Sequence, residues 1–276
     1  MPASAVETWD PADAAAWIRR PVPSDDKYSR GVLGCATGSD AYAGAAVLGV
    51  EAALHTGIGM VRYLGPTSAS SLVLARRPEA IIGAGRVQAW LVGSGMDPDD
   101  EEARGRILTA LSADVPTVID AGALPFAADR AHEAAILTPH AGELAAFLGI
   151  DRAEVAAHPI DSATAAANRL GAVVALKGAT TTVTDGQRVV QVTEATPWLA
   201  TAGAGDALAG ILGALAASRA ADGPVSNAEL VGLGAAAAFI HGRSARLANE
   251  RNARGPFTIL DLVAAVPAVI GQLLRS

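Results

Sequence analysis

Cysteine, aromatic residues and clustered positive charge are all scarce in this 276-residue sequence. The single cysteine, Cys35, excludes an intramolecular disulfide and a cysteine-based zinc site, and it suits a reducing cytoplasm. Aromatic residues make up only 4% of the chain, so the core must consist mainly of Ala, Val, Leu and Ile. A formal net charge of −7 without a basic run argues against a nucleic-acid or anionic-membrane surface.

Segments that direct a chain to or through a membrane are also missing. The N-terminus carries acids but no basic region before an apolar stretch, so we expect no secretory signal. The longest weakly polar run, 230–240, is too short to span a bilayer. We therefore expect a cytoplasmic protein. The P-loop, Rossmann and HExxH signatures are likewise not found.

What is present is an alternation of short apolar runs with helical patterns after an N-terminal arm. The arm covers residues 1–26, with a helix expected over Pro11 to Arg19. Strands are predicted at 31–36, 60–64, 89–93, 117–120, 134–138 and 171–178, and helices at 42–55, 98–113, 142–149, 205–219, 226–249 and 258–273. The pair Asp185-Gly186 predicts a hairpin within 180–193. This order indicates an α/β fold with a mainly parallel sheet, in which ligands bind beyond the carboxyl ends of the strands.

The stretch TAGAGDALAG (201–210) surrounds one aspartate with small residues and runs into an apolar helix. Gly203 and Gly205 allow a tight turn and a close approach to a ligand. A glycine turn at a helix N-terminus presents free N–H groups that bind an anion. Asp206 could also be a simple N-cap of that helix, and the motif alone leaves both interpretations open.

Two further loops carry charged residues where a strand is expected to end. In ILTPHAGELAAFLG (136–149), His140 and Glu143 follow a strand and open a helix. Taken as an isolated motif, this stretch favours a solvated histidine and a first-turn glutamate that interacts with the helix dipole over a binding site. In ALKGATT (175–181), Lys177 follows another strand and could be a solvated lysine, or part of a cradle for phosphate or ribose.

Taken together and in this order, these motifs resemble the ADP-dependent NAD(P)H-hydrate dehydratases. The similarity rests on GSDAYAGAAVLGVEAALHTGIGMV (38–61), VGSGMD, LTPHAGE, LKGATT and PWLATAGAGDALAG, and it extends from about Lys27 to about Leu274. It implies a ribokinase-like fold, a three-layer α/β/α sandwich in which 1–276 form a single domain. In these 276 residues we therefore expect no epimerase domain of the kind that is fused to some relatives.

The resemblance also implies an activity and a set of site residues. The family repairs NADH or NADPH that has been hydrated at C6 of the nicotinamide ring, and it converts ADP to AMP and phosphate. The matching motifs imply that the hydrated dinucleotide is contacted by Ala45, Gly95, His140 and Asp206. They imply that the adenine nucleotide is bound by Lys177, Gly178, Ala179, Thr180, Thr181 and Gly205. The implied anion hole consists of Gly203, Ala204 and Gly205, and the implied general base is Asp206. Asp120, in VIDAGAL, occupies a strand-end position that serves either a metal or the structure of the site.

The same resemblance implies Mg²⁺ as cofactor, small-molecule ligands and a homo-oligomer, a tetramer as in the family. Two alternatives remain at this stage. One is a ribokinase-like kinase of the hydroxymethylpyrimidine or hydroxyethylthiazole type, which leaves a phosphorylated product. The other is a non-catalytic nucleotide-binding protein, although a sensor has no need of a base such as Asp206.

Overall fold

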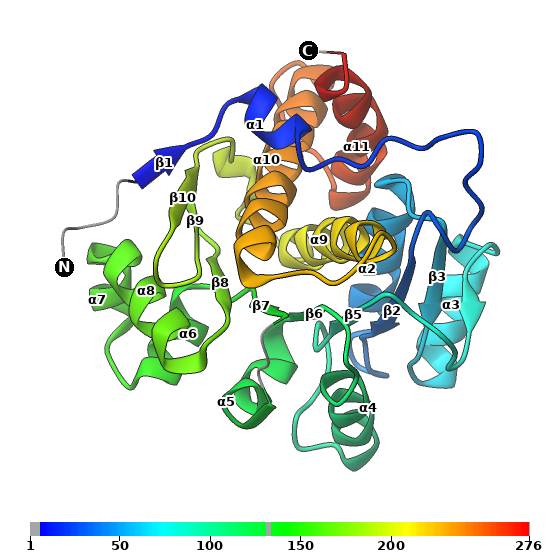
Figure 1. Ribbon diagram of the computed structural model, residues 1–276, viewed down its shortest axis with the longest axis horizontal. Helices are drawn as coiled ribbons and strands as arrows, with labels where there is room; N and C mark the ends of the chain where they lie inside the picture. The colour runs from blue at the N-terminus through cyan, green and yellow to red at the C-terminus, as the bar shows by residue number, and fades with distance from the viewer. Residues whose placement is uncertain (1–5, 131–133, 276) are drawn as a thin grey trace.

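One ten-stranded sheet forms the centre of the computed structural model, which describes residues 6–130 and 134–275 (Figure 1). The strand order is β1-β10-β9-β8-β7-β6-β5-β2-β3-β4. The strands are β1 (Val6–Thr8), β2 (Val32–Ala36), β3 (Met60–Tyr63), β4 (Ile81–Ile82), β5 (Ala89–Val92), β6 (Thr117–Ile119), β7 (Ala135–Leu137), β8 (Val173–Leu176), β9 (Thr181–Thr184) and β10 (Val189–Val192). Only β9 runs antiparallel to its neighbours, so the predicted mainly parallel α/β sheet is confirmed.

Helices cover both faces of this sheet (Figure 1). The elements are α1 (Pro11–Ala15), α2 (Ala43–His55), α3 (Thr67–Arg76), α4 (Glu101–Leu111), η1 (Ala121–Phe126), α5 (Ala127–Arg130), α6 (Ala141–Leu148), α7 (Arg152–Ala157), α8 (Pro159–Leu170), η2 (Pro197–Leu199), α9 (Ala204–Ala220), α10 (Asn227–Arg251) and α11 (Ile259–Leu273). Helices α2, α9 and α10 pack on one face, and α4 and α8 pack on the other. None of the helices in the described residues is long and apolar enough to cross a membrane.

Small residues allow the two central helices α2 and α9 to approach closely. Gly210 of α9 faces Gly49 and Ala52 of α2, and a Cβ added at Gly210 would lie 2.3 Å from the Gly49 carbonyl oxygen and 2.9 Å from the Ala52 Cβ. The small residues of the Ala-rich core, which the composition predicted, therefore allow close helix packing. They hold the first half of α9 against α2.

Replacing Gly210 with alanine is expected to lower the free energy of unfolding by about 1–3 kcal/mol, because the backbone of α2 cannot yield to the added methyl group. Gly105 provides the matched control. It lies exposed in α4 with open space around its Cβ position. Gly105→Ala should therefore stabilise the protein by about 0.5–1 kcal/mol. Urea unfolding measures both variants, and equal effects would contradict this account of the α2–α9 contact.

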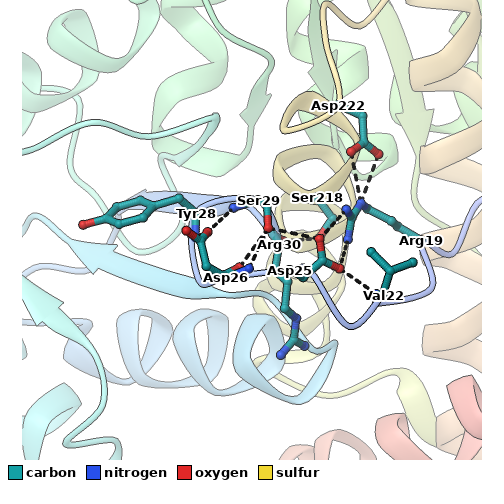
Figure 2. A network of polar contacts seen from close by, with 9 residues as sticks. All are labelled: Arg19, Val22, Asp25, Asp26, Tyr28, Ser29, Arg30, Ser218 and Asp222. Atoms are coloured by element: carbon teal, nitrogen blue, oxygen red, sulfur yellow. Dashed lines mark hydrogen bonds and ion pairs between the residues drawn. The ribbon is translucent and has the colours of Figure 1, made fainter.

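The N-terminal arm differs from its prediction. Its helix ends at Ala15 rather than near Arg19, and the preceding residues form β1, which pairs in parallel with β10 at the edge of the sheet. Figure 2 shows how the following loop is fixed to the body of the protein. Arg19 lies between Asp25 and Asp222, at 2.8 Å and 3.0 Å, and so joins the loop to the end of α9.

Most other predicted elements are present, but several observed elements were not anticipated. The hairpin at Asp185-Gly186 is confirmed, with Gly186 at a φ of +93° between β9 and β10. Besides β1, the unanticipated elements are α3, β4, η1, α5, α7, α8 and η2. A polar, Ser-rich composition hides α3, β4 has only two residues, and Pro159 separates α7 from α8.

Candidate active site

Four polar side chains meet at the carboxyl edge of neighbouring parallel strands. Ser94, Asp120, Thr138 and Lys177 follow β5, β6, β7 and β8 respectively. The Asp120 carboxylate accepts hydrogen bonds from the Ser94 hydroxyl at 2.8 Å, the Thr138 hydroxyl at 2.7 Å and the Lys177 ammonium at 2.7 Å. Lys177, whose side chain is 18% exposed, is thus held in an ion pair with the buried Asp120, and the interpretation of this residue as a solvated lysine is wrong.

The glycine turn before α9 has the geometry of an anion site. Gly203 is the N-cap residue, with a φ of +89°, and no side chain caps the helix. Among the described residues, the N–H groups of Gly205 and Asp206 have no acceptor. Asp206 occupies the third helical position and does not cap α9, so the N-cap interpretation of Asp206 is wrong. The turn leaves free N–H groups beside a carboxylate.

The Asp206 carboxyl group is half-buried and has no hydrogen-bond partner among the described residues. Burial, together with the negative charge of Asp120, raises the pKa of Asp206 to about 6, although Lys177 acts in the opposite direction. Burial alone would lower the pKa of Lys177, but the charges of Asp120, Glu143 and Asp206 raise it above its ordinary value. At neutral pH the site thus holds a cation next to an unpaired carboxylate that is close to its titration point, as expected of a general base.

His140 caps α6. Its Nδ1 accepts the Glu143 N–H at 3.1 Å, and the Glu143 carboxylate accepts the His140 N–H at 2.7 Å, which completes a capping box. The His140 side chain is 61% exposed. A bridge to Lys177 places the His140 backbone beside the start of the ALKGATT loop. The loop at His140 and the ALKGATT loop, which are separate motifs in the sequence, are therefore neighbours in the fold.

A cavity of about 820 Å³ opens beside these groups, which is within the usual size of a ligand site. Its walls come from the strand-end loops, the loop before α9, and α10. Of the residues predicted for the site, the lining includes His140, Lys177, Gly178, Ala179, Thr181, Ala204 and Gly205. The apolar part of the wall includes Val192, Ala195, Pro197, Leu199, Leu208 and Ala238.

Five other predicted residues do not line this cavity: Ala45, Gly95, Thr180, Gly203 and Asp206. Ala45 and Gly95 lie against each other, since a Cβ added at Gly95 would be 2.6 Å from the Ala45 Cβ. They form a second group at the start of α2. The backbone of Asp206 lies 3.8 Å from the Cβ position of Gly49, one turn further along the same helix.

The sequence alone did not single out Ser94, Thr138 or His241. Ser94 and Thr138 stand within two residues of the end of a buried strand, a position that could have revealed them. His241 lies in α10 within a long apolar segment, lines the cavity and is only 8% exposed. A histidine in such a segment gives no periodic signal, so only the fold shows that it faces a cavity.

The donor set limits how a metal ion could be held. In residues 6–130 and 134–275, no group of three or more His, Cys, Asp or Glu side chains could bind a metal ion. Both Asp120 oxygens already accept hydrogen bonds within the protein. Mg²⁺ commonly retains waters and binds through substrate phosphates with one or two carboxylates. The residues present fit that arrangement, with Glu143 and Asp206 as the carboxylates, besides Asp120, whose charges act on Lys177.

Known proteins share this sequence and fold. The bifunctional NAD(P)H-hydrate repair enzyme of Mycobacterium tuberculosis is 42% identical over 226 residues, which cover 76% of this chain and 46% of that protein. The ADP-dependent (S)-NAD(P)H-hydrate dehydratase of Xanthomonas campestris is 32% identical, with 93% of each chain covered. The chain spans about half the length of the bifunctional relatives it matches.

A similar solved structure is that of the ADP/ATP-dependent NAD(P)H-hydrate dehydratase of Bacillus subtilis, co-crystallised with ATP and Mg²⁺. It superposes with a TM-score of 0.85 at 24% identity, and the match covers 97% of this chain and 99% of that chain. The solved structure of a ribokinase-like superfamily protein also matches this chain. The two structural matches confirm the predicted ribokinase-like α/β architecture. Residues 33–267 match the sequence profile of the NAD(P)H-hydrate dehydratases. Because of this match and the similarity to the relatives named above, the chain belongs to the NAD(P)H-hydrate dehydratase family.

Proposed function

We propose that this protein is a lyase that dehydrates (6S)-hydrated NADH or NADPH and consumes ADP, with release of AMP and phosphate. One observation carries the proposal. Asp206 is a half-buried carboxylate with a pKa raised to about 6, at the start of a helix where, among the described residues, its side chain and the N–H groups of Gly205 and Asp206 have no hydrogen-bond partner. The names of the relatives from Xanthomonas and Mycobacterium support the same reaction.

The chemistry follows from these groups. The C6 hydroxyl of the hydrated ring is a poor leaving group, so it first receives the β-phosphoryl group of ADP. Asp206 accepts the proton of that hydroxyl as the new O–P bond forms and the bond to AMP breaks. The free N–H groups at Gly205 and Asp206 stabilise negative charge on the transferred phosphoryl group. The lone pair of the ring nitrogen then expels phosphate from C6, and C5 releases a proton to the departing phosphate, which restores the C5–C6 double bond.

The two groups of residues divide the ligands between them in this proposal. The cavity at Lys177, the ALKGATT loop and Gly205 takes ADP, because it combines a cation with an apolar wall. The hydrated dinucleotide then lies toward Ala45 and Gly95, with Asp206 between the two ligands. His140 stays a proposed dinucleotide contact at the border of the cavity. Mg²⁺ would neutralise charge on the nucleotide phosphates.

The remaining features follow from family membership. The described part of the chain forms a continuous sheet, and we propose that residues 1–276 act as a single domain in the cytoplasm. A homo-oligomer, a tetramer as in the family, belongs to the same proposal. Its ligands are the hydrated cofactor and ADP, and neither a nucleic acid nor a membrane is a partner.

The deciding experiment incubates the protein with hydrated NADH, Mg²⁺ and ADP and follows the near-ultraviolet absorbance of the NADH that is formed. Absorbance should rise with ADP much faster than with ATP at matched concentrations, because the sequence resembles the ADP-using branch. Chromatography should detect AMP and inorganic phosphate in equal amounts. A stable phosphorylated product without NADH would favour the kinase alternative, and equal or faster rates with ATP would contradict the ADP preference.

A further inference from the structure

One ring nitrogen of the buried His241 side chain has no partner among the described residues, while the ring also makes a hydrogen bond with the Ala204 backbone. The ring lies on α10, lines the cavity and is only 8% exposed. Among the described residues, its Nε2 has no hydrogen-bond partner. Buried side-chain nitrogens are nearly always hydrogen-bonded, because leaving one unpaired costs free energy of folding. A ligand in the cavity could supply the missing partner.

The position of the ring on the wall indicates which part of a nucleotide it would meet. On one side lies the backbone of Ala204, the first residue of α9 and part of the anion turn. On the other side, Ala238 lies three residues earlier on the same face of α10 and belongs to the apolar wall. His241 therefore stands between the section suited to phosphate and the section suited to a base. In a nucleoside diphosphate, that intermediate group is the sugar.

The protonation state of the ring agrees with a sugar hydroxyl as partner. Burial lowers the pKa of His241 to about 4, although the Ala204 backbone beside it acts in the opposite direction. At neutral pH the imidazole is thus uncharged, with one N–H donor and one bare nitrogen acceptor. A phosphate oxygen can only accept, whereas a hydroxyl can both donate and accept. Because the ring makes a hydrogen bond with the Ala204 backbone, Nε2 is the nitrogen left for the ligand, and a hydroxyl can pair with it whether Nε2 carries the proton or the lone pair.

We propose that His241 hydrogen-bonds a ribose hydroxyl of the nucleotide bound in this cavity and so positions the diphosphate at the glycine turn. This inference rests on the proposed function, because it takes the cavity as the ADP site. His241 acts on the ligand but not on the reacting bond. Loss of its hydrogen bonds should weaken nucleotide binding while proton transfer by Asp206 remains intact.

The test compares ADP, 2′-deoxy-ADP and 3′-deoxy-ADP by isothermal titration calorimetry without hydrated cofactor. Wild-type protein should bind one of the deoxynucleotides about tenfold more weakly than ADP. His241→Leu, which keeps most of the side-chain volume, should bind ADP about tenfold more weakly and lose this discrimination. His241→Gln, which retains a donor and an acceptor, should recover part of both. His158→Ala changes an exposed histidine and should match wild type.

Thermal unfolding without nucleotide separates this role from a structural one. His241→Leu removes the unpaired Nε2 together with the hydrogen bond to the Ala204 backbone, so its Tm without nucleotide should change little, while the stabilisation by ADP should shrink. A lower Tm with unchanged ADP affinity, or unchanged discrimination against the deoxynucleotides, overturns the inference while the proposed function stands. Absence of ADP binding to wild-type protein overturns both.

Discussion

Replacement of Asp206 with asparagine is expected to lower kcat by about 10²-fold or more, while the fold and ligand binding persist. Asparagine preserves the size of the side chain but cannot accept the proton of the substrate hydroxyl. Because the Asp206 carboxylate makes no hydrogen bond among the described residues and does not cap α9, its loss removes no hydrogen bond from the fold. Steady-state kinetics and thermal unfolding on the same preparation measure both effects.

Asp261 provides the matched control, because it occupies the third position of α11 as Asp206 does in α9. Asp261 completes a capping box with Thr258, at 2.8 Å from both the Thr258 N–H and its hydroxyl. Asp261→Asn should therefore lower Tm and leave kcat unchanged, which is the opposite of Asp206→Asn. If Asp206→Asn retains a near-normal kcat, the proposed mechanism is wrong.

The pH dependence of kcat tests the same base. The pKa of Asp206 is raised to about 6, so the carboxylate is present above that pH and is protonated below it. The rate should consequently fall as pH decreases through about 6, well above the range in which an ordinary aspartate titrates. Asp206→Asn should lose this acidic limb together with most of its rate.

Replacement of Lys177 with methionine should be the most destabilising of the changes considered. Asp120 would remain 2% exposed without its cation, and removing one partner of a buried ion pair typically costs about 3–5 kcal/mol. The loss of a charged contact should also weaken ADP binding by about 1.5–3 kcal/mol. Urea unfolding and calorimetry with ADP separate the two effects.

Two further variants keep the test interpretable if Lys177→Met folds poorly. The double variant Asp120→Asn, Lys177→Met removes both charges, so it should recover most of the stability but not the ADP affinity. The chain has only one other lysine, the exposed Lys27, and Lys27→Met should match wild type in both measurements. Normal ADP affinity in the double variant would show that Lys177 supports the fold alone.

The fold and the loops of the site could be read from the sequence because their signals are local. Apolar runs bounded by glycine located the central strands, and Asp185-Gly186 located the hairpin. The TAGAGD stretch identified the free helix N-terminus before α9. Each of these features depends on residues that are near one another in the chain, and general rules for turns and helix ends apply to them.

Features that depend on distant residues could not be read in this way. The pairing of Lys177 with Asp120 joins residues 57 positions apart, and the local sequence of each resembles that of a solvated charge at a strand end. His241 lies in a helix that is buried nearly all round, so no polar face distinguished its position. In both cases tertiary packing decides whether a side chain meets water, another charge or a cavity.

The pairing of β1 with β10 has a consequence for the order in which the protein is made. The Arg188–Glu7 ion pair at this edge joins residues 181 positions apart, so β1 leaves the ribosome long before its partner exists. The cost of closing so long a loop cannot be met until β10 is in place. We therefore expect β1 to dock last during synthesis, and β10 to be an open sheet edge, exposed to strand pairing with other chains, until it does.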